Sequence, residues 1–87
     1  MRLKTLRVTE GETVLVTNPW EGETEARNTM ISGSSWSYDG EGTVGTAALS
    51  GTDATVLLTP ETGGVLSNTV LLANGETLVA ERQVEIA

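Results

Sequence analysis

The side chains in this chain that could do chemistry are serine hydroxyls and carboxylates. Residues 32–37 ("SGSSWS") contain four serines, and Asp39 and Glu41 follow them. A serine nucleophile needs a base beside it, but the chain has no histidine and a single lysine, Lys4. The carboxylate pair could bind calcium or act in sugar hydrolysis, yet its spacing does not match an EF-hand loop. We interpret the pair as a solvated acidic turn and predict no enzyme, no cofactor and no metal site.

The aromatic residues could form a binding site of another kind. Trp36 and Tyr38 share one face of an expected strand, because side chains of a strand alternate with period two. Exposed beside the serines, they would suit a carbohydrate-binding module, whereas a tryptophan buried in a sandwich is the commoner arrangement. Trp20 follows Pro19 in an expected loop, where it either packs on its own domain or docks on a neighbour.

Composition and charge exclude several classes of function. There is no cysteine, which excludes disulfides and thiolate zinc sites. The net charge of −7 argues against nucleic acid as a partner, and no apolar run is long enough to span a membrane. Three basic residues lie within the first seven positions, while the remaining 80 carry twelve acids against two arginines. The basic start is either simply solvated or docks on the acidic body of another copy or a neighbour.

The elements that position these residues are predicted to be strands, because Thr, Val and Leu dominate and no helical stripe occurs. About seven short strands separated by turns predict an all-β, immunoglobulin-like β-sandwich of antiparallel strands, formed as one domain by residues 1–87. Residues 1–24 are a possible docking hairpin, and Gly33 is a possible bulge. The expected strands are residues 3–8, 13–18, 26–38, 43–49 and 55–59, followed by a hairpin over residues 65–87.

The final hairpin carries the strongest prediction about an interface. Asn74-Gly75 is the preferred pair for a two-residue type I′ turn. That turn places one set of side chains in the core, namely Val65, Leu71, Leu78, Ala80, Val84 and Ile86. A second apolar set then faces outward, where the N-terminal strands, a shift of register or a partner could account for it. The candidate interface residues are Arg2, Lys4, Arg7, Trp20, Leu66, Val70, Leu72 and Val79.

From residue 31 onward the order of short motifs resembles the small virion proteins of tailed phages known as fiber-tail adaptors. The motifs are a serine pair before a tryptophan, a Thr-rich short strand, a Gly-Gly turn, a strand with Asn-Thr, a Gly turn and a Glu-Arg pair. They correspond here to Ser34, Ser35 and Trp36; residues 55–58; Gly63 and Gly64; Asn68 and Thr69; Gly75; and Glu81 and Arg82. The family's upstream Asp-Trp is replaced by Asn-Pro-Trp at residues 18–20.

The resemblance implies an immunoglobulin-like sandwich without catalysis, present in many copies in a virion. We therefore expect a structural component of a bacteriophage tail or head–tail adaptor, located in the virion. Its expected partners are copies of itself, as a homo-oligomer, and other virion proteins. A capsid decoration protein is the nearest alternative, and a carbohydrate-binding module is the alternative of another class.

Overall fold

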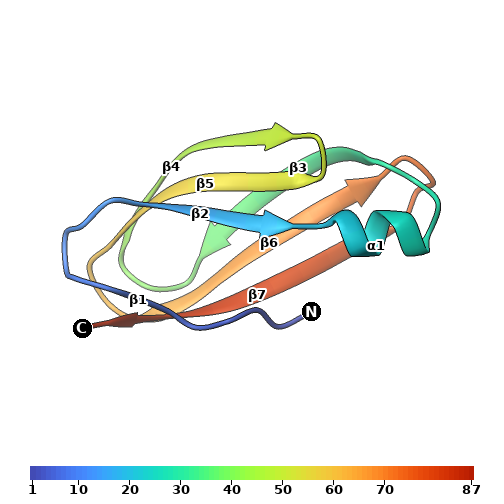
Figure 1. Ribbon diagram of the computed structural model, residues 1–87. Coiled ribbons are helices and arrows are strands. Elements are labelled where there is room, and N and C mark those ends of the chain that lie inside the picture. Colours follow the sequence, from blue (N-terminus) through green and yellow to red (C-terminus); the bar gives the residue numbers. More distant parts are fainter.

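The alternation of Thr, Val and Leu produces seven strands that stack as two facing sheets, with one short helix at an end of the sandwich (Figure 1). This architecture is seen in a computed structural model that describes residues 1–87. The elements are β1 (Leu6–Val8), β2 (Val14–Pro19), α1 (Glu21–Ala26), β3 (Ile31–Tyr38), β4 (Gly42–Ser50), β5 (Asp53–Pro60), β6 (Gly64–Leu72) and β7 (Thr77–Ile86).

The order of the strands confirms the predicted fold class. One sheet has the order β1-β7-β6-β3 and the other has the order β2-β5-β4. Immunoglobulin domains place strands B, E and D in one sheet and strands C, F and G in the other. Here β2, β5 and β4 take the first set of places, and β3, β6 and β7 take the second. β1 departs from the expected antiparallel pattern, because it runs parallel to β7.

The first strand is shorter than predicted because its pairing with β7 is interrupted. Arg2 bridges Glu81, 79 positions later, whereas Leu6 pairs with a residue 78 positions later. The register therefore changes by one residue around Lys4. The carbonyl of Lys4 accepts a hydrogen bond from the side chain of Arg82, at 2.8 Å. A side chain of β7 thus satisfies a backbone group near the break in the ladder.

Residues 1–24 do not form the predicted hairpin. β1 belongs to the four-stranded sheet, whereas β2 pairs antiparallel with β5 in the three-stranded sheet. The turn between them crosses from one sheet to the other at one end of the sandwich (Figure 1). The physical reason is burial: Val8 and Val16 are both buried and pack in one cluster, to which they contribute from opposite sheets.

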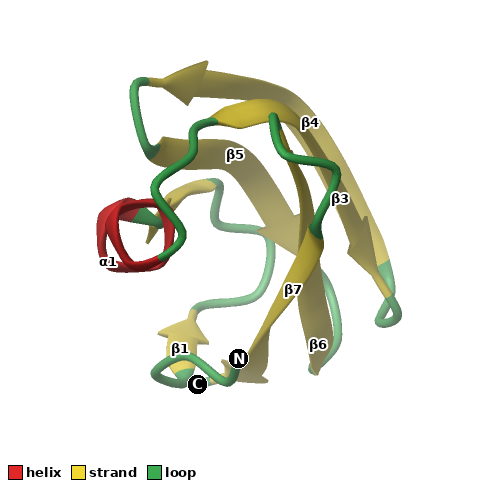
Figure 2. Ribbon diagram, turned by 90° about the vertical axis from the view of Figure 1, so that its right-hand side faces the viewer, coloured by secondary structure: helices red, strands yellow, loops and turns green.

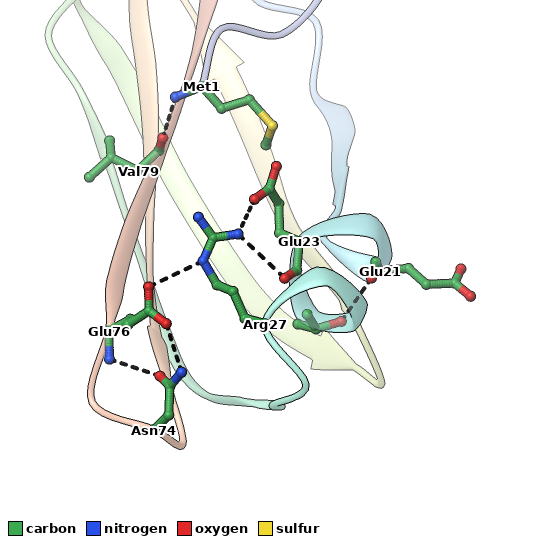
Figure 3. A network of polar contacts seen from close by, with 8 residues as sticks. Met1, Glu21, Glu23, Arg27, Asn74, Glu76 and Val79 are labelled. Atoms are coloured by element: carbon green, nitrogen blue, oxygen red, sulfur yellow. Dashed lines mark hydrogen bonds and ion pairs between the residues drawn. The ribbon is translucent and has the colours of Figure 1, made fainter.

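Helix α1 replaces part of the expected loop before β3, and β3 begins at Ile31 instead of at the predicted residue 26. Two glutamates in its first turn suit the positive end of the helix dipole. At its other end Asn28 takes a left-handed φ of 50°, and its amide donates to the carbonyl of Glu25, which closes the helix. The guanidinium of Arg27 contacts Glu76 at 3.2 Å and so joins the helix to the β6–β7 hairpin (Figure 3).

The β6–β7 hairpin has a three-residue loop instead of the predicted two-residue loop. The amide of Gly75, with φ 95°, donates to the carbonyl of Leu72 at 3.0 Å, and the amide of Leu72 donates to Glu76 at 2.8 Å. Asn74 lacks the positive φ that a type I′ turn requires. The extra loop residue shifts the register by one, which turns the side chains of β6 to the opposite face.

This change of register overturns the prediction that the hairpin exposes a second apolar face. Leu66, Val70 and Leu72 are buried in the core of the isolated chain, so their assignment to an interface is wrong. Leu71, predicted to be in the core, is half exposed. Val79, the fourth apolar residue predicted to face outward, is exposed, at 45%. The hairpin therefore provides no evidence that a partner covers it.

Two apolar clusters fill the space between the sheets. The first consists of Val8, Val16, Val56, Leu58, Leu66 and Val84. The second consists of Trp20, Ala54, Val70, Leu72 and Ala80. Trp36 of β3 packs against both clusters, in the place of the strand C tryptophan of immunoglobulin domains.

Candidate interaction surface and buried polar layer

Three polar side chains lie at one level between the sheets and separate the two apolar clusters. Asn18 is on β2, Asn68 is on β6 and Arg82 is on β7. Each of the three polar residues is flanked along the chain by the two clusters. The residue two positions away in one direction belongs to the first cluster, and the residue two positions away in the other direction belongs to the second. Because the three strands come from both sheets, this polar layer fixes how the sheets sit against each other.

Asn68 is the centre of this layer and uses its whole hydrogen-bonding capacity. Its side-chain oxygen accepts hydrogen bonds from the indole N–H of Trp20 at 2.9 Å and from the side-chain amide of Asn18 at 3.2 Å. Its side-chain nitrogen donates to the hydroxyl of Ser34 at 2.9 Å and to the carbonyl of Ser35 at 3.0 Å. A side-chain amide has two donors and two acceptor lone pairs, so Asn68 is fully satisfied although it is completely buried.

Arg82 extends the layer toward the N-terminal residues. Its guanidinium donates to the side-chain oxygen of Asn18 at 3.1 Å and to the carbonyl of Lys4 at 2.8 Å. The Nε atom is buried without a partner. Burial without a carboxylate lowers the pKa of Arg82 from its usual value, because the charged form loses solvation. Arg82 thus holds β2, β7 and the N-terminal residues together by hydrogen bonds to neutral oxygens.

Several of the hydroxyls and carboxylates that could do chemistry are engaged in structure. Ser34 accepts a hydrogen bond from Asn68, and Asp39 accepts one from the amide of Val65 at 2.6 Å. The hydroxyl of Tyr38 donates to the carbonyl of Thr62. Burial, and then the charge of Asp39, raise the pKa of Tyr38 above its ordinary value. No group of three acidic residues is arranged to hold a metal ion.

The structure resolves the two alternatives for Trp20. Its side chain is 1% exposed and lies in the second cluster, so it packs on its own domain and cannot be an interface anchor. Trp36 and Tyr38 share a face as predicted, and both pack against the core. Neither tryptophan therefore offers an open platform for stacking a sugar ring.

The basic residues of the N-terminal stretch are exposed, as a docking strand would require. Arg2 lies 4.0 Å from Glu81, and Arg7 lies 3.8 Å from Glu85. Lys4 is also exposed. Both ion pairs link these residues to β7 across the outer surface of the four-stranded sheet. Exposed pairs at this separation contribute little to stability, so they guide the pairing of the strands more than they strengthen it.

A different surface carries the features of an interface. On the outward face of the three-stranded sheet, Leu15 of β2 pairs with Leu57 of β5, and the exposed fraction of Leu15 is 63%. Threonines and small residues surround them, and Asp53 at the start of β5 is the only charged residue in the three strands. In a chain with twelve acids, a sheet with one charge is depleted in the way that the centre of an interface is.

Strand β4 extends this surface to the edge of the sheet. All nine of its residues are exposed, none is charged, and Val44 and Leu49 are the largest. A strand at an edge presents unpaired backbone groups that another strand can bind. Lysines, prolines or short length protect most natural edges, but β4 has only a bulge between Val44 and Ala47.

The space between the edges of the two sheets is shallowly hollowed beside β4. A groove of about 210 Å³ lies between β3 and β4 and is lined by Ser34, Ala47, Ala48 and Leu49. Figure 2 shows β3 and β4 running near each other on the same side of the sandwich. We use the name "β4 surface" for residues 42–50 together with the outward side chains Leu15 and Leu57.

A second hollow lies between α1, the N-terminus and the start of β7. Its volume is about 300 Å³, and it is lined by Met1, Trp20, Glu23, Arg27, Thr77, Leu78 and Val79. The guanidinium of Arg27 is already shared between Glu23 and Glu76, and the amino group of Met1 donates to the carbonyl of Val79 (Figure 3). The charged groups of this hollow are therefore paired within the chain.

Sequence reasoning missed the polar layer and the β4 surface. The motif residues Ser34, Ser35, Asn68 and Arg82 meet in the layer, although they are far apart in the sequence. The signal for β4 was present: residues 42–52 contain no charge and no proline.

Helix α1 is too short to cross a membrane, and it is the one helix of the fold.

No family model matches this chain, and the search of curated proteins finds no match.

Proposed function

We propose that this protein is a non-enzymatic structural module that assembles with further copies of itself through the β4 surface, as a component of a tailed-phage virion. The observation that carries the proposal is β4 itself, a nine-residue edge strand that is wholly exposed and uncharged. Pairing of β4 with the β4 of a second copy extends the three-stranded sheet across both molecules.

The interior of the domain supports a structural role. The buried side chains of Asn18, Asn68 and Trp20 bind one another, and these bonds fix the relation between the two sheets. The resemblance to fiber-tail adaptors supports the placement in a virion. Asn68 and Arg82 of the matching motifs belong to the polar layer, so these motif residues have a structural role in this fold. The location at the tail or head–tail junction follows from the same resemblance.

Light scattering coupled to size-exclusion chromatography tests the self-assembly. We expect the wild-type chain to have a mass that is a multiple of 9.1 kDa and that falls on dilution. Ala48→Lys puts a charge on the edge strand that pairs, where lysine commonly guards against such pairing, and it should weaken assembly by roughly tenfold in Kd or more. Leu15→Lys changes β2, which lies two strands away from that edge, and should leave assembly unchanged. Ala48→Lys should be monomeric under conditions where the wild type and Leu15→Lys are not.

Thr77→Lys is the matched control, because Thr77 is equally exposed but lies on the four-stranded sheet. It should assemble as the wild type does. Equal masses for all four proteins would contradict the assignment of the interface. The placement in a virion is tested separately, by mass spectrometry and antibody labelling of purified particles. Its absence from particles would refute that part of the proposal, and labelling of the capsid surface would favour a decoration protein.

A further inference from the structure

The strand at the edge of β7 makes its backbone hydrogen bonds on one side only, to β7. Residues 1–8, which we name the leading segment, run along β7 in parallel. The amide of Leu3 donates to the carbonyl of Glu81, and the amide of Glu81 donates to the carbonyl of Met1, both at 2.7 Å. At the end of the segment, the carbonyl of Val8 accepts a hydrogen bond from the amide of Ala87 at 2.7 Å. The backbone partners of the leading segment thus lie on β7 and its end.

Charge complementarity favours the leading segment at this edge. The segment carries Arg2, Lys4 and Arg7, a charge of +3, whereas the remaining 79 residues carry twelve acids against two arginines, a charge of −10. In the parallel register, Arg2 faces Glu81 and Arg7 faces Glu85. A parallel strand with basic residues at these two positions therefore fits the edge of β7 better than an acidic strand does.

The connection after the leading segment allows the segment to leave its own domain. Residues 9–13 are all exposed and link two strands that belong to different sheets. Gly11 takes a left-handed φ of 79°, and the amide of Gly11 makes a single long bond to Pro60 at 3.3 Å. A connection that is exposed and contains a glycine can straighten without disturbing the strand pairing of the three-stranded sheet. The core position that Val8 leaves is refilled when the segment of another copy brings its own Val8.

We propose that the edge of β7 is a strand-acceptor site whose second ligand is the leading segment of another copy of this chain. In the exchanged dimer each segment makes on its partner the contacts that it makes on its own domain, so the exchange costs little beyond bringing two copies together. The site is distinct from the β4 surface, because β1 and β4 are edges of different sheets. The inference therefore does not depend on the proposed function.

Cysteine cross-linking tests the exchange cleanly, since the chain has no cysteine of its own. Arg7 and Glu85 are paired across β1 and β7, and both are exposed. We would prepare Arg7→Cys in one chain and Glu85→Cys in a second chain of different mass, mix the folded proteins, and oxidise them. Exchange predicts a mixed disulfide, with a yield several-fold above that of Arg7→Cys mixed with Glu25→Cys, whose cysteine lies on α1.

A charge-swap pair provides an independent reading of the same site. One chain carries Arg2→Glu and Arg7→Glu, and the other carries Glu81→Arg and Glu85→Arg. Each chain alone places like charges across β1 and β7, whereas exchange between them restores opposite charges at both sites. Native mass spectrometry of the mixture should therefore show the mixed dimer in excess over either homodimer.

The proposal is overturned if mixed disulfides do not exceed the control and the charge-swap chains do not combine. In that case the double variant Arg7→Cys/Glu85→Cys should close its disulfide wholly within one chain. That result would leave the β4 surface intact, because assembly through β4 is measured with Ala48→Lys. Loss of assembly in Ala48→Lys with continued exchange at β7 would show the converse.

Discussion

The indole nitrogen of Trp20 donates a 2.9 Å hydrogen bond to the side-chain oxygen of Asn68, deep between the two sheets. Trp20 follows β2 in the three-stranded sheet, and Asn68 lies on β6 in the four-stranded sheet. A buried polar bond between sheets has only one satisfied arrangement, since a small slide would leave both groups unpaired. This contact therefore contributes specificity of packing that apolar side chains alone do not give.

Removing the amide of Asn68 should destabilise the fold strongly. Asn68→Ala leaves the indole of Trp20 and the side-chain amide of Asn18 without acceptors, and each unpaired buried group costs about 1–3 kcal/mol. We expect a loss of roughly 3–5 kcal/mol in the free energy of unfolding, measured by urea denaturation. Asn74→Ala, at an exposed turn, is the control and should lose about 1 kcal/mol or less. Similar losses in both variants would show that the layer does not stabilise the domain.

Arg82 should hold the N-terminal residues through its neutral partners. Arg82→Met keeps much of the aliphatic packing but leaves the carbonyl of Lys4 and the oxygen of Asn18 without this donor. We expect a loss of about 2–4 kcal/mol and faster hydrogen exchange at the amide of Leu3. Arg7→Met, which removes only an exposed ion pair, should change stability by about 0.5 kcal/mol or less. Unchanged exchange at Leu3 in the Arg82 variant would argue against this role.

Two glycine substitutions should act in opposite directions. A Cβ on Gly64 would lie 2.6 Å from a carboxylate oxygen of Asp39 and 2.7 Å from the amide nitrogen of Gly40, so Gly64→Ala forces two turns apart and should cost about 1–3 kcal/mol. Gly22 lies within α1 with open space around it, so Gly22→Ala should stabilise by about 0.5–1 kcal/mol. Thermal unfolding of both variants measures the difference, and a stabilising Gly64→Ala would show that the turns do not pack as described.

Tyr38 should make the domain sensitive to alkali. Because burial raises its pKa above 10.0, the folded state holds the proton more tightly than the unfolded state. The stabilising contribution is therefore complete below pH 10 and is lost as the pH rises through the raised pKa. We expect the free energy of unfolding to fall more steeply above pH 10 in the wild type than in Tyr38→Phe, where both states lack the ionisable group. Parallel curves for the two proteins would exclude the effect.

The existence of the strands was predictable because alternation and turn residues are local signals. Seven strands, the sandwich and the bulge near Gly33 all follow from them. The face of β7 was also correct, since Ala80 and Val84 are buried. These features depend on neighbours within a few residues of each other.

The face of β6 was wrong because one loop residue decides it. Asn-Gly suits both a two-residue turn and the second half of a three-residue loop, and the two loops differ in parity. The alternation within β6 held the better signal. Its even positions carry Leu66, Val70 and Leu72, whereas its odd positions carry Val65 and Leu71 with two polar residues.

The polar layer and the helix depend on other information. Asn18, Asn68 and Arg82 lie on three strands, so only the stacking of the sheets brings them together. Helix α1 is short, and Asn28 at its end was the local sign of its termination. The pairing of β1 with β7 joins the two ends of the sequence, where no local pattern indicates a contact.

Hydrogen exchange at β4 tests the central claim most directly. The amides of residues 42–50 that point away from β5 are open in a single chain, and pairing with a second β4 would protect them. We predict that these amides exchange more slowly in concentrated than in dilute wild-type protein, and that Ala48→Lys abolishes the difference while amides of β6 are unchanged. Equal exchange at β4 across concentrations, in a protein that remains a 9.1 kDa monomer, would contradict the account.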